Sequence, residues 1–281
     1  MKKGMKVWLL IAAIFCSVGL TVCVIAWAAV DFDLMKLDTA DFVDNVYEFD
    51  GYMDGIHISF DTANIRFGVS PDNVVRVFTH EKEDNPHTVQ KAGGKLLISR
   101  MVKPWYQKLG FSFEEEWITI HLPKDVFYLL TAKVSTADVV LPSGLSFSGV
   151  NIETDTGDVH IASSVRGSIL VEADYGDVLL ENTNPKHIEI ETDTGDVTLK
   201  NILCRYDLSI TTDTGDIRFD RVDAQSLTIE TDTGDVEGTL LSDKTFDVTT
   251  DTGRKKYPKE TVGGLCKITT DTGDIVIDIV K

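Results

Sequence analysis

The sequence predicts an all-β protein: a parallel β-solenoid, a single-stranded β-helix-like stack of 19–20-residue rungs, preceded by one transmembrane α-helix. Three observations lead to this prediction. A long uncharged segment lies near the N-terminus, a Thr-Asp-Thr-Gly-Asp motif recurs at nearly constant spacing, and apolar residues fall at fixed offsets from that motif. A fixed period of this length is typical of repeat proteins whose units stack on one another.

The uncharged segment spans residues 7–30, and residues 1–6 before it hold three lysines. A bilayer core requires about 20 apolar residues in a helix, so this segment is long enough to cross a membrane. Trp8 and Trp27 lie near its two ends, where amphipathic rings favour the headgroup level. Because the lysines precede the segment, the positive-inside rule predicts a cytoplasmic N-terminus and an extracytoplasmic C-terminal domain. We therefore expect a single-pass protein of the cell membrane.

A cleaved signal peptide is the alternative interpretation of this segment, since Ala26 and Ala28 form a small-x-small site. The apolar region of a signal peptide is usually about 7–15 residues long, well short of this one. A lipoprotein signal around Cys23 does not fit, because Val22 stands where a small residue is required. The sequence favours a retained anchor.

The part of the chain after the anchor is strongly acidic. From Asp31 onward it holds all 45 acidic residues and 24 of the 27 basic ones, a net charge of about −21. This charge argues against nucleic-acid binding, which needs a basic surface, and against lying flat on an anionic lipid surface. Only Cys204 and Cys266 lie in this part, so a dense disulfide framework is excluded.

Seven turns share the Thr-Asp-Thr-Gly-Asp signature, with Ala173 and Tyr175 as variants in the second turn and Arg254 in place of the last aspartate in the sixth. The glycines are separated by 19, 19, 20, 19, 19 and 20 residues. We expect glycine at this corner because a sharp turn needs a residue that tolerates positive φ. The seven glycines are Gly157, Gly176, Gly195, Gly215, Gly234, Gly253 and Gly273.

Apolar residues form three columns around these glycines, and the residues between the first two columns are mostly polar. The period is therefore two, and each arm of the repeat is a strand. The first column, seven residues before the glycine, holds Val150, Ile169, Ile188, Leu208, Leu227, Phe246 and Cys266. The second, five residues before it, holds Ile152, Val171, Ile190, Ile210, Ile229, Val248 and Ile268. The third, two residues after it, holds Val159, Val178, Val197, Ile217, Val236, Lys255 and Ile275.

A unit of this length cannot bury its own apolar face, but stacked copies can, with parallel in-register strands about 4.8 Å apart. Weaker copies extend the pattern backwards, with Ala137 in the glycine position and Ile56 and Ile58 as an inward pair. Additional early strands are expected at 74–78, 96–99, 117–122 and 128–133. The predicted organisation is a cytoplasmic N-terminus (1–6), a transmembrane helix (7–30), a tether (31–44) and a solenoid (45–281), with irregular rungs at 45–143 and regular rungs at 144–281.

The rung Ile-x-Ile-x-Thr-Asp-Thr-Gly-Asp-Val, together with the strand from Trp117 to Pro123, resembles the bacterial putative-adhesin ("toastrack") β-strand-repeat family of envelope proteins with an N-terminal membrane anchor. The resemblance covers nearly all of the exported part. It implies a surface or envelope-stress function, and it supplies no catalytic residues to carry over. The family's name implies adhesion.

The Asp-Thr-Gly triplet is also the active-site signature of aspartic proteases, in which two carboxylates about 3 Å apart share one proton. Here the triplet recurs six times at solenoid spacing, so no single pair of carboxylates is set apart. We therefore expect no catalytic residues and no enzymatic activity.

Two columns of aspartates follow from the repeat, one before and one after the glycine. Adjacent like charges at 4.8 Å repel by roughly 1 kcal/mol even in water, so something must offset the repulsion. Turn chemistry is one explanation, because aspartate accepts hydrogen bonds from nearby backbone N–H groups. Bridging Ca²⁺ is the alternative, and no other cofactor is expected. The Ca²⁺ candidates are Asp193, Asp196, Asp213, Asp216, Asp232 and Asp235.

Three segments depart from the regular pattern. The apolar stretch at 101–113 offers Trp105, Tyr106, Phe111 and Phe113 as candidate contacts with a partner, or else it packs over an open end of the stack. The basic stretch 254–259 reads as a solvated loop that relieves repulsion. Residues 275–281 would leave an apolar edge strand, which is expected either to be covered by an early segment or to mediate self-association.

These observations favour a non-catalytic, membrane-anchored cell-envelope module, a scaffold or interaction protein in a surface or envelope-stress function. It would contact the membrane through its helix, and it would bind another envelope protein or a second copy of itself. An adhesin, or a calcium- or glycan-binding surface module, is the alternative. An enzyme acting on an envelope polymer is less favoured, because it would show carboxylates converging at one irregular rung, whereas these acids repeat evenly.

Overall fold

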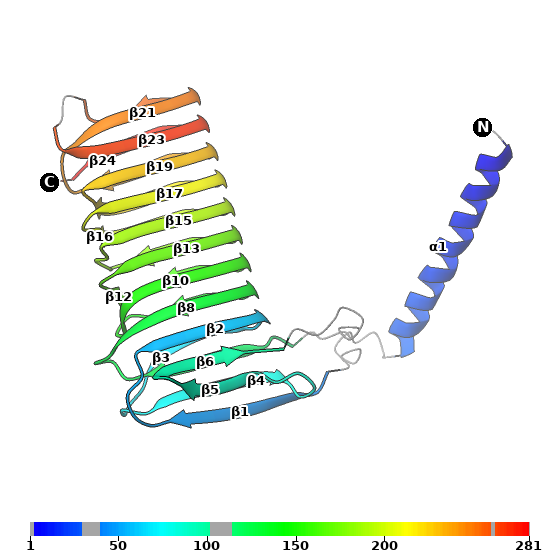
Figure 1. Cartoon of the computed structure of the whole chain (residues 1–281). Helices are drawn as coiled ribbons and strands as arrows, with labels where there is room; N and C mark the ends of the chain where they lie inside the picture. The colour runs from blue at the N-terminus through cyan, green and yellow to red at the C-terminus, as the bar shows by residue number, and fades with distance from the viewer. Residues whose placement is uncertain (1–2, 30–39, 102–113, 260–261, 281) are drawn as a thin grey trace. The chain divides into compact units, whose positions relative to one another are not determined.

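The computed structural model describes residues 3–29, 40–101, 114–259 and 262–280. It divides into two compact units, Met1–Asp41 with Lys103–Glu115 and Phe42–Val102 with Glu116–Lys281. The first unit holds α1 (Lys3–Ala29), and the second holds the strands (Figure 1). Within α1, Leu10–Ala28 has a mean hydropathy of 2.5 and is long and apolar enough to cross a membrane.

Strands fill the second unit as the repeat predicts, and each regular rung contributes one strand before its glycine and one after it. The early strands are β1 (Phe42–Phe49), β2 (Gly55–Thr62), β3 (Asn64–Val69), β4 (Val75–Lys82), β5 (Thr88–Ala92), β6 (Lys95–Ser99), β7 (Trp117–Leu122), β8 (Phe127–Thr136) and β9 (Val139–Leu141). The later strands are β10 (Ser146–Thr156), β11 (Val159–Ile161), β12 (Ser164–Val165), β13 (Ser168–Tyr175), β14 (Val178–Glu181), β15 (His187–Thr194), β16 (Val197–Leu203), β17 (Asp207–Thr214), β18 (Ile217–Asp223), β19 (Ser226–Thr233), β20 (Val236–Leu240), β21 (Lys244–Thr252), β22 (Lys255–Lys256), β23 (Gly264–Thr272) and β24 (Ile275–Ile279).

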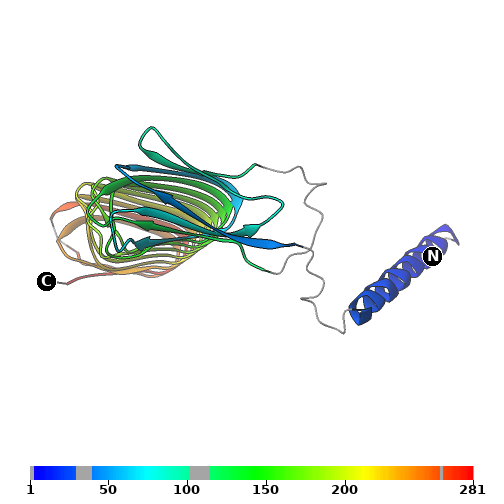
Figure 2. The same ribbon diagram turned by 90° about the horizontal axis from the view of Figure 1, so that it is seen from below.

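The strands form two long sheets that face each other across one core, and Figure 2 looks along the stack so that the two layers are visible. One sheet has the order β1-β4-β7-β3-β9-β11-β14-β16-β18-β20-β24-β22. The other has the order β21-β23-β19-β17-β15-β13-β10-β8-β2-β6-β5, with β12 paired to β10. From β8 and β9 onward all pairs are parallel, and the inward columns stay in register, as Val171↔Ile190 and Ile190↔Ile210 illustrate. The register shifts locally in the β8–β10 pair at Phe147 and in the β18–β20 pair after Phe219.

The core is made of the predicted inward columns. Ile152, Val171, Ile190, Ile210 and Ile229 are 0–1% exposed. Ile56 and Ile58 are also buried, so the inward pair of the early rung is confirmed. Cys266 is fully buried in its apolar column, whereas Phe246 in the same column is only partly buried and packs on Tyr257.

The reason for glycine at the corner differs from the prediction. Gly157 and Gly176 have φ of 139° and 151°, but positive φ is not shared by the later glycines of the motif. What all of them share is close contact between rungs: a Cβ on Gly215 would lie 2.0 Å from the carbonyl oxygen of Gly195. Because the backbones of consecutive corners touch, a side chain at this position would push the rungs apart.

The N-terminal end of the stack is closed by antiparallel strands, which the fully parallel prediction did not include. β1 pairs antiparallel with β4, and β4 with β7, at the edge of one sheet. β5 folds back on β6 at the edge of the other. β1 begins at Phe42 rather than at residue 45, so it takes in the end of the predicted tether.

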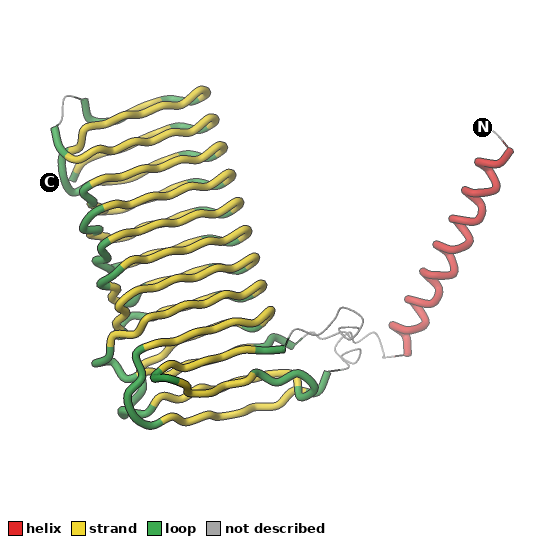
Figure 3. Tube along the Cα trace, in the orientation of Figure 1, coloured by secondary structure: helices red, strands yellow, loops and turns green. Residues whose placement is uncertain are grey.

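The C-terminal end departs from the order of the sequence. β23 lies between β19 and β21, and β24 lies between β20 and β22, so the last segment of the chain is interposed and the sixth rung is outermost (Figures 1 and 3). The prediction that residues 275–281 form the outermost edge of the stack is therefore wrong: β24 pairs with β20 over Ile275–Ile279 and with β22 at Ile275 and Val276. It is covered by the sixth rung, not by an early segment.

Candidate functional site

The aspartates that follow each glycine form a ladder of hydrogen bonds between rungs. The backbone N–H of each aspartate donates to Oδ1 of the aspartate in the rung before it, as Asp196 N–H does to Asp177 at 2.9 Å and Asp235 N–H to Asp216 at 2.9 Å. The ladder starts at Asn64, whose Oδ1 accepts from Asp138 N–H, and ends at Arg254, whose N–H donates to Asp274. Its members are Asn64, Asp138, Asp158, Asp177, Asp196, Asp216, Asp235, Asp274 and Arg254.

This ladder explains how closely stacked carboxylates are tolerated. Each Oδ1 satisfies a backbone N–H that would otherwise lack a partner at the corner, and hydrogen bonds to a charged acceptor are stronger than neutral ones. Aspartate thus accepts from backbone N–H groups, as turn chemistry predicts, but the donor belongs to the next rung and not to its own turn. The repeated acid is part of the scaffold.

The six Ca²⁺ candidates fall into two separate sets. Asp196, Asp216 and Asp235 are consecutive members of the ladder, and Arg218 donates to Oδ2 of Asp196 at 3.0 Å and of Asp216 at 2.5 Å. Asp193, Asp213 and Asp232 are exposed on the other side of the glycine. Among the residues that the structure describes, no group of three or more His, Cys, Asp or Glu side chains is arranged to hold a metal ion.

The predicted partner contacts Trp105, Tyr106, Phe111 and Phe113 lie outside the described residues.

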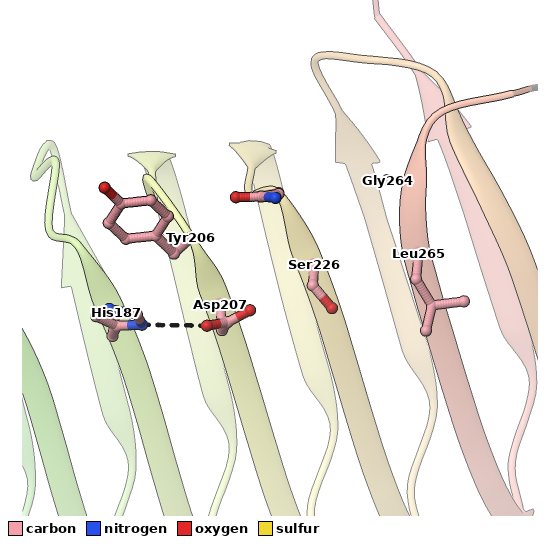
Figure 4. Close-up of a pocket in the computed structure, with 7 residues that line it drawn as sticks. His187, Tyr206, Asp207, Ser226, Gly264 and Leu265 are labelled. Carbon is pink, nitrogen blue, oxygen red and sulfur yellow. Dashed lines mark ion pairs between the residues drawn. The ribbon is translucent and has the colours of Figure 1, made fainter.

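An open depression lies at the opposite ends of the strands, where the chain enters β15, β17, β19 and β23 (Figure 4). Its volume is about 650 Å³. His187 Nδ1 lies 3.2 Å from Asp207 Oδ2, and the His187 ring stacks on Tyr206 with centroids 5.1 Å apart. The Arg205 guanidinium lies 5.4 Å from the centroid of the same tyrosine ring. The lining residues are His187, Tyr206, Asp207, Gln225, Ser226, Gly264 and Leu265.

Gln225 and Gly264 also line a second depression of about 510 Å³, so the two depressions adjoin across the turns of consecutive rungs, and together they are called the groove. Lys244 is one of the residues that line this second depression, and it is 3% exposed. Lys244 Nζ donates to Asp223 Oδ1 at 2.5 Å and to the Ala224 carbonyl at 2.6 Å. This buried ammonium is therefore paired with a carboxylate and hydrogen-bonded, as burial of a charge requires.

The groove brings together a histidine, an aspartate and a serine, but not in the order that a hydrolase needs. His187 is in register with Asp207, and Asp207 with Ser226, so the aspartate lies in the middle. A nucleophilic serine requires the histidine between itself and the aspartate. Since in-register strands are about 4.8 Å apart, His187 and Ser226 are separated by roughly 10 Å. The arrangement cannot transfer a proton from the serine to the histidine.

A buried polar cluster that the sequence analysis did not predict lies between the sheets at the N-terminal end of the stack. Glu81 is fully buried and accepts hydrogen bonds from Asn45 Nδ2 at 2.8 Å, Thr79 Oγ1 at 2.8 Å, and both the backbone N–H and Nδ1 of His87 at 2.5 Å. Burial by itself raises the pKa of Glu81, but these hydrogen bonds outweigh burial and lower it. The carboxylate is held in its charged form.

His87 is the second member of this cluster. Its side chain is buried, its ring packs edge-on against Phe60, and Nε2 has no hydrogen-bond partner among the described residues. Burial, followed by the nearby Arg100 guanidinium, lowers the pKa of His87, although Glu81 acts in the opposite direction. Arg100 in turn pairs with Glu116, which also lies 3.7 Å from Lys82 Nζ.

The chain is similar to proteins of a known family and to solved structures. The family model described as Toastrack DUF4097 matches residues 53–205 and 163–281. A putative adhesin from Parabacteroides distasonis ATCC 8503 is similar in structure, with a TM-score of 0.50 and 11% identity over 85% of this chain and 98% of that one. A putative adhesin from Bacteroides fragilis NCTC 9343 gives a TM-score of 0.48 and 14% identity over 85% of this chain and 97% of that one. No curated protein matches the chain.

Proposed function

The chain belongs to the Toastrack DUF4097 family, and from this premise we propose that it is a non-catalytic interaction module of the cell envelope. Its helix α1 anchors it in the membrane with the N-terminus in the cytoplasm, and the solenoid is exported. The solenoid is a rigid scaffold that presents an irregular surface to another envelope protein. The similar solved structures support the fold alone.

The aspartate ladder is the observation that carries this proposal. Because Oδ1 of each ladder aspartate accepts the N–H of the next rung, the repeated acidic motif maintains the stack and is not a row of reacting groups. The residue types differ most between rungs at the other end of the strands, where Tyr206, Gln225 and Gly264 line the groove and form no repeated column. These groove residues distinguish one rung from another, and a partner that recognises this protein through side-chain contacts would bind there.

Site-specific photo-cross-linking in the native cell tests the proposal. A photoreactive residue at Tyr206 is expected to give one discrete adduct with an envelope protein. The same residue at Glu191, which is exposed on the regular face of β15, is the matched control and is expected to give none. Identical adducts from the two positions would show that the groove is not the contact surface.

An adhesin is the second candidate function. The structure with a TM-score of 0.50 is described as a putative adhesin, although at 11% identity that likeness supports the fold and not the activity. Attachment of cells to a surface or to an immobilised glycan separates the two candidates. An adhesin loses attachment when residues 45–281 are deleted, whereas a scaffold for another envelope protein shows no such loss.

A further inference from the structure

The last two rungs are stacked in the reverse of their order in the sequence, and the second inward column does not explain this. Val248 pairs with Ile268, and Ile229 pairs with Ile268 on the other side. If the sixth rung instead lay directly on the fifth, Val248 would pair with Ile229 and the second column would remain continuous. Two orders of the same chain therefore satisfy this column equally well.

The third column distinguishes the two orders. In the observed order Ile275 lies between Val236 and Lys255, and both Val236 and Ile275 are fully buried. Lys255 is exposed because its rung is outermost, and its Nζ reaches the Val248 carbonyl at 3.4 Å. In the sequential order Lys255 would lie between Val236 and Ile275. An ammonium group placed there would be enclosed by apolar side chains without a carboxylate, which is strongly unfavourable.

The corner gives the same preference. Arg254 takes the place of an aspartate in the ladder, so its rung offers no carboxylate oxygen to the N–H of a following rung. In the outermost position this loss has no effect on the stack. In the sequential order the N–H of Asp274 would face Arg254 and lose the acceptor that Asp235 now provides at 2.7 Å.

We propose that the charge of Lys255 selects between two stacking orders and thereby keeps the apolar strand β24 inside the solenoid. In the sequential order β24 would be an edge strand along its whole length, because Ile275 and Val276 would lose the pairing that β22 now provides. An exposed edge with these residues invites pairing with another chain. The sixth rung is thus a cap that prevents end-to-end association of the solenoid.

Pairs of introduced cysteines report the order, because neighbouring in-register positions meet the geometry of a disulfide and positions two strands apart do not. In the full chain, with Cys16 and Cys23 replaced by serine, Thr228→Cys with Lys267→Cys is expected to cross-link in the observed order. Thr228→Cys with Asp247→Cys cross-links only in the sequential order. Asp247→Cys with Lys267→Cys cross-links in both, and it shows that the end of the stack is folded.

Lys255→Val is expected to raise the yield of the 228–247 link at least about tenfold and to make the chain associate in light scattering. Lys255→Arg keeps the charge and is expected to leave the 228–267 link dominant. If Lys255→Val preserves both the 247–267 and the 228–267 links with no 228–247 link, the order is set elsewhere and the proposal is wrong. Phe246→Val, tested in parallel, identifies the size of Phe246 as that other determinant if it alone produces the 228–247 link.

Discussion

Arg254 closes the aspartate ladder on Asp274 through both its backbone and its side chain. The backbone N–H of Arg254 lies 2.8 Å from Oδ1 of Asp274, while Nε and Nη2 lie 2.9 and 2.5 Å from Oδ2. Asp274, the last carboxylate of the ladder, therefore accepts hydrogen bonds from three donor atoms of a single residue. The basic stretch, expected to be a solvated loop, includes the terminus of the scaffold.

This contact predicts an unusual titration. The hydrogen bonds from the Arg254 side chain, and then from its backbone, lower the pKa of Asp274 below its ordinary value. A lowered carboxyl pKa adds stability that is present above about pH 3.9 and is lost as the pH falls through the folded-state value. Carboxyl chemical shifts across an acid titration should show the pKa of Asp274 below the ordinary aspartate value, and Arg254→Ala should raise that pKa towards the ordinary value. Unchanged titration of Asp274 in that variant would contradict the contact.

The ladder predicts that the oxygen acceptor matters more than the charge. Asn64 already starts the ladder with an amide oxygen, so Asp196→Asn should preserve the acceptor for Asp216 N–H. Asp196→Ala removes it and should lower the free energy of unfolding by about 1 kcal/mol. Chemical denaturation of both variants measures the difference, and equal losses would show that Oδ1 is not the group that matters.

The inward and outward assignments predict a much larger contrast. Ile190→Asp places a carboxylate in a fully buried column and should lower the free energy of unfolding by more than about 3 kcal/mol. Asp193→Asn changes an exposed side chain and should alter it by less than about 0.5 kcal/mol. Thermal melts compare them directly. Matching midpoints would overturn the assignment of the two faces.

The buried cluster predicts a loss of stability in mild acid. Because the pKa of His87 is lowered by burial and by Arg100, the unfolded chain binds a proton that the folded chain does not as the pH falls below about 6.5. The free energy of unfolding should therefore decrease as the pH is lowered from about 6.5 to 5. Protonation of Glu81 should reduce it further only below the unfolded-state pKa of that residue, about 4.3. His87→Gln should flatten this upper range in melts at pH 7.5 and 5, and a profile identical to the wild type would remove His87 from the account.

Calcium binding by the aspartate columns stays a prediction that a melt can test. Binding to the folded state raises its stability by mass action, so millimolar Ca²⁺ should raise the melting temperature by several degrees if Asp193, Asp213 and Asp232 or their ladder neighbours are ligands. Mg²⁺ and Na⁺ at matched ionic strength should do much less. Equal shifts with all three salts would reduce the effect to screening of repulsion.

The regular part of the fold was predictable because the same pattern of apolar and polar residues recurs in every repeat. A column such as Ile190 and Ile210 specifies both which face is buried and which register the strands adopt, since a slip by one residue would expose every apolar side chain. The corner was located correctly by its glycines. The physical reason for glycine at the corner was not predicted. It lies in the contact between the Gly195 carbonyl and Gly215, which involves two rungs and cannot be seen in any single turn.

The order of the rungs was predicted wrongly because like repeats are interchangeable in sequence. Lys255 stands in a column of valine and isoleucine, and Arg254 stands in the place of the ladder aspartate. These two departures could have marked the sixth rung as outermost. The buried cluster had a signal as well. Glu81 continues the inward alternation of Val75, Val77 and Thr79 in β4, and an inward carboxylate requires a partner. Nothing in the spacing identified His87 as that partner.

The groove had no signal in the sequence at all. Tyr206 and Gln225 lie at corresponding places in consecutive rungs, just before the paired residues Asp207 and Ser226, and variation there resembles ordinary loop diversity. Gly264 lies against the backbone of Gln225 only because its rung is interposed, so this part of the groove could not be predicted without the order of the strands.

The aspartate ladder makes the length of this solenoid a modular quantity. At the corner of every internal rung, the carboxylate accepts a hydrogen bond from the next rung and the backbone N–H donates one to the preceding rung. Rungs between Asn64 and Arg254 are therefore equivalent to their neighbours at the corner. Tandem duplication of a single repeat in the gene would therefore insert one more step of about 4.8 Å while leaving both terminal structures unchanged. The distance between the two ends of the domain can evolve by whole steps, as a ruler is extended, without a new solution for either end.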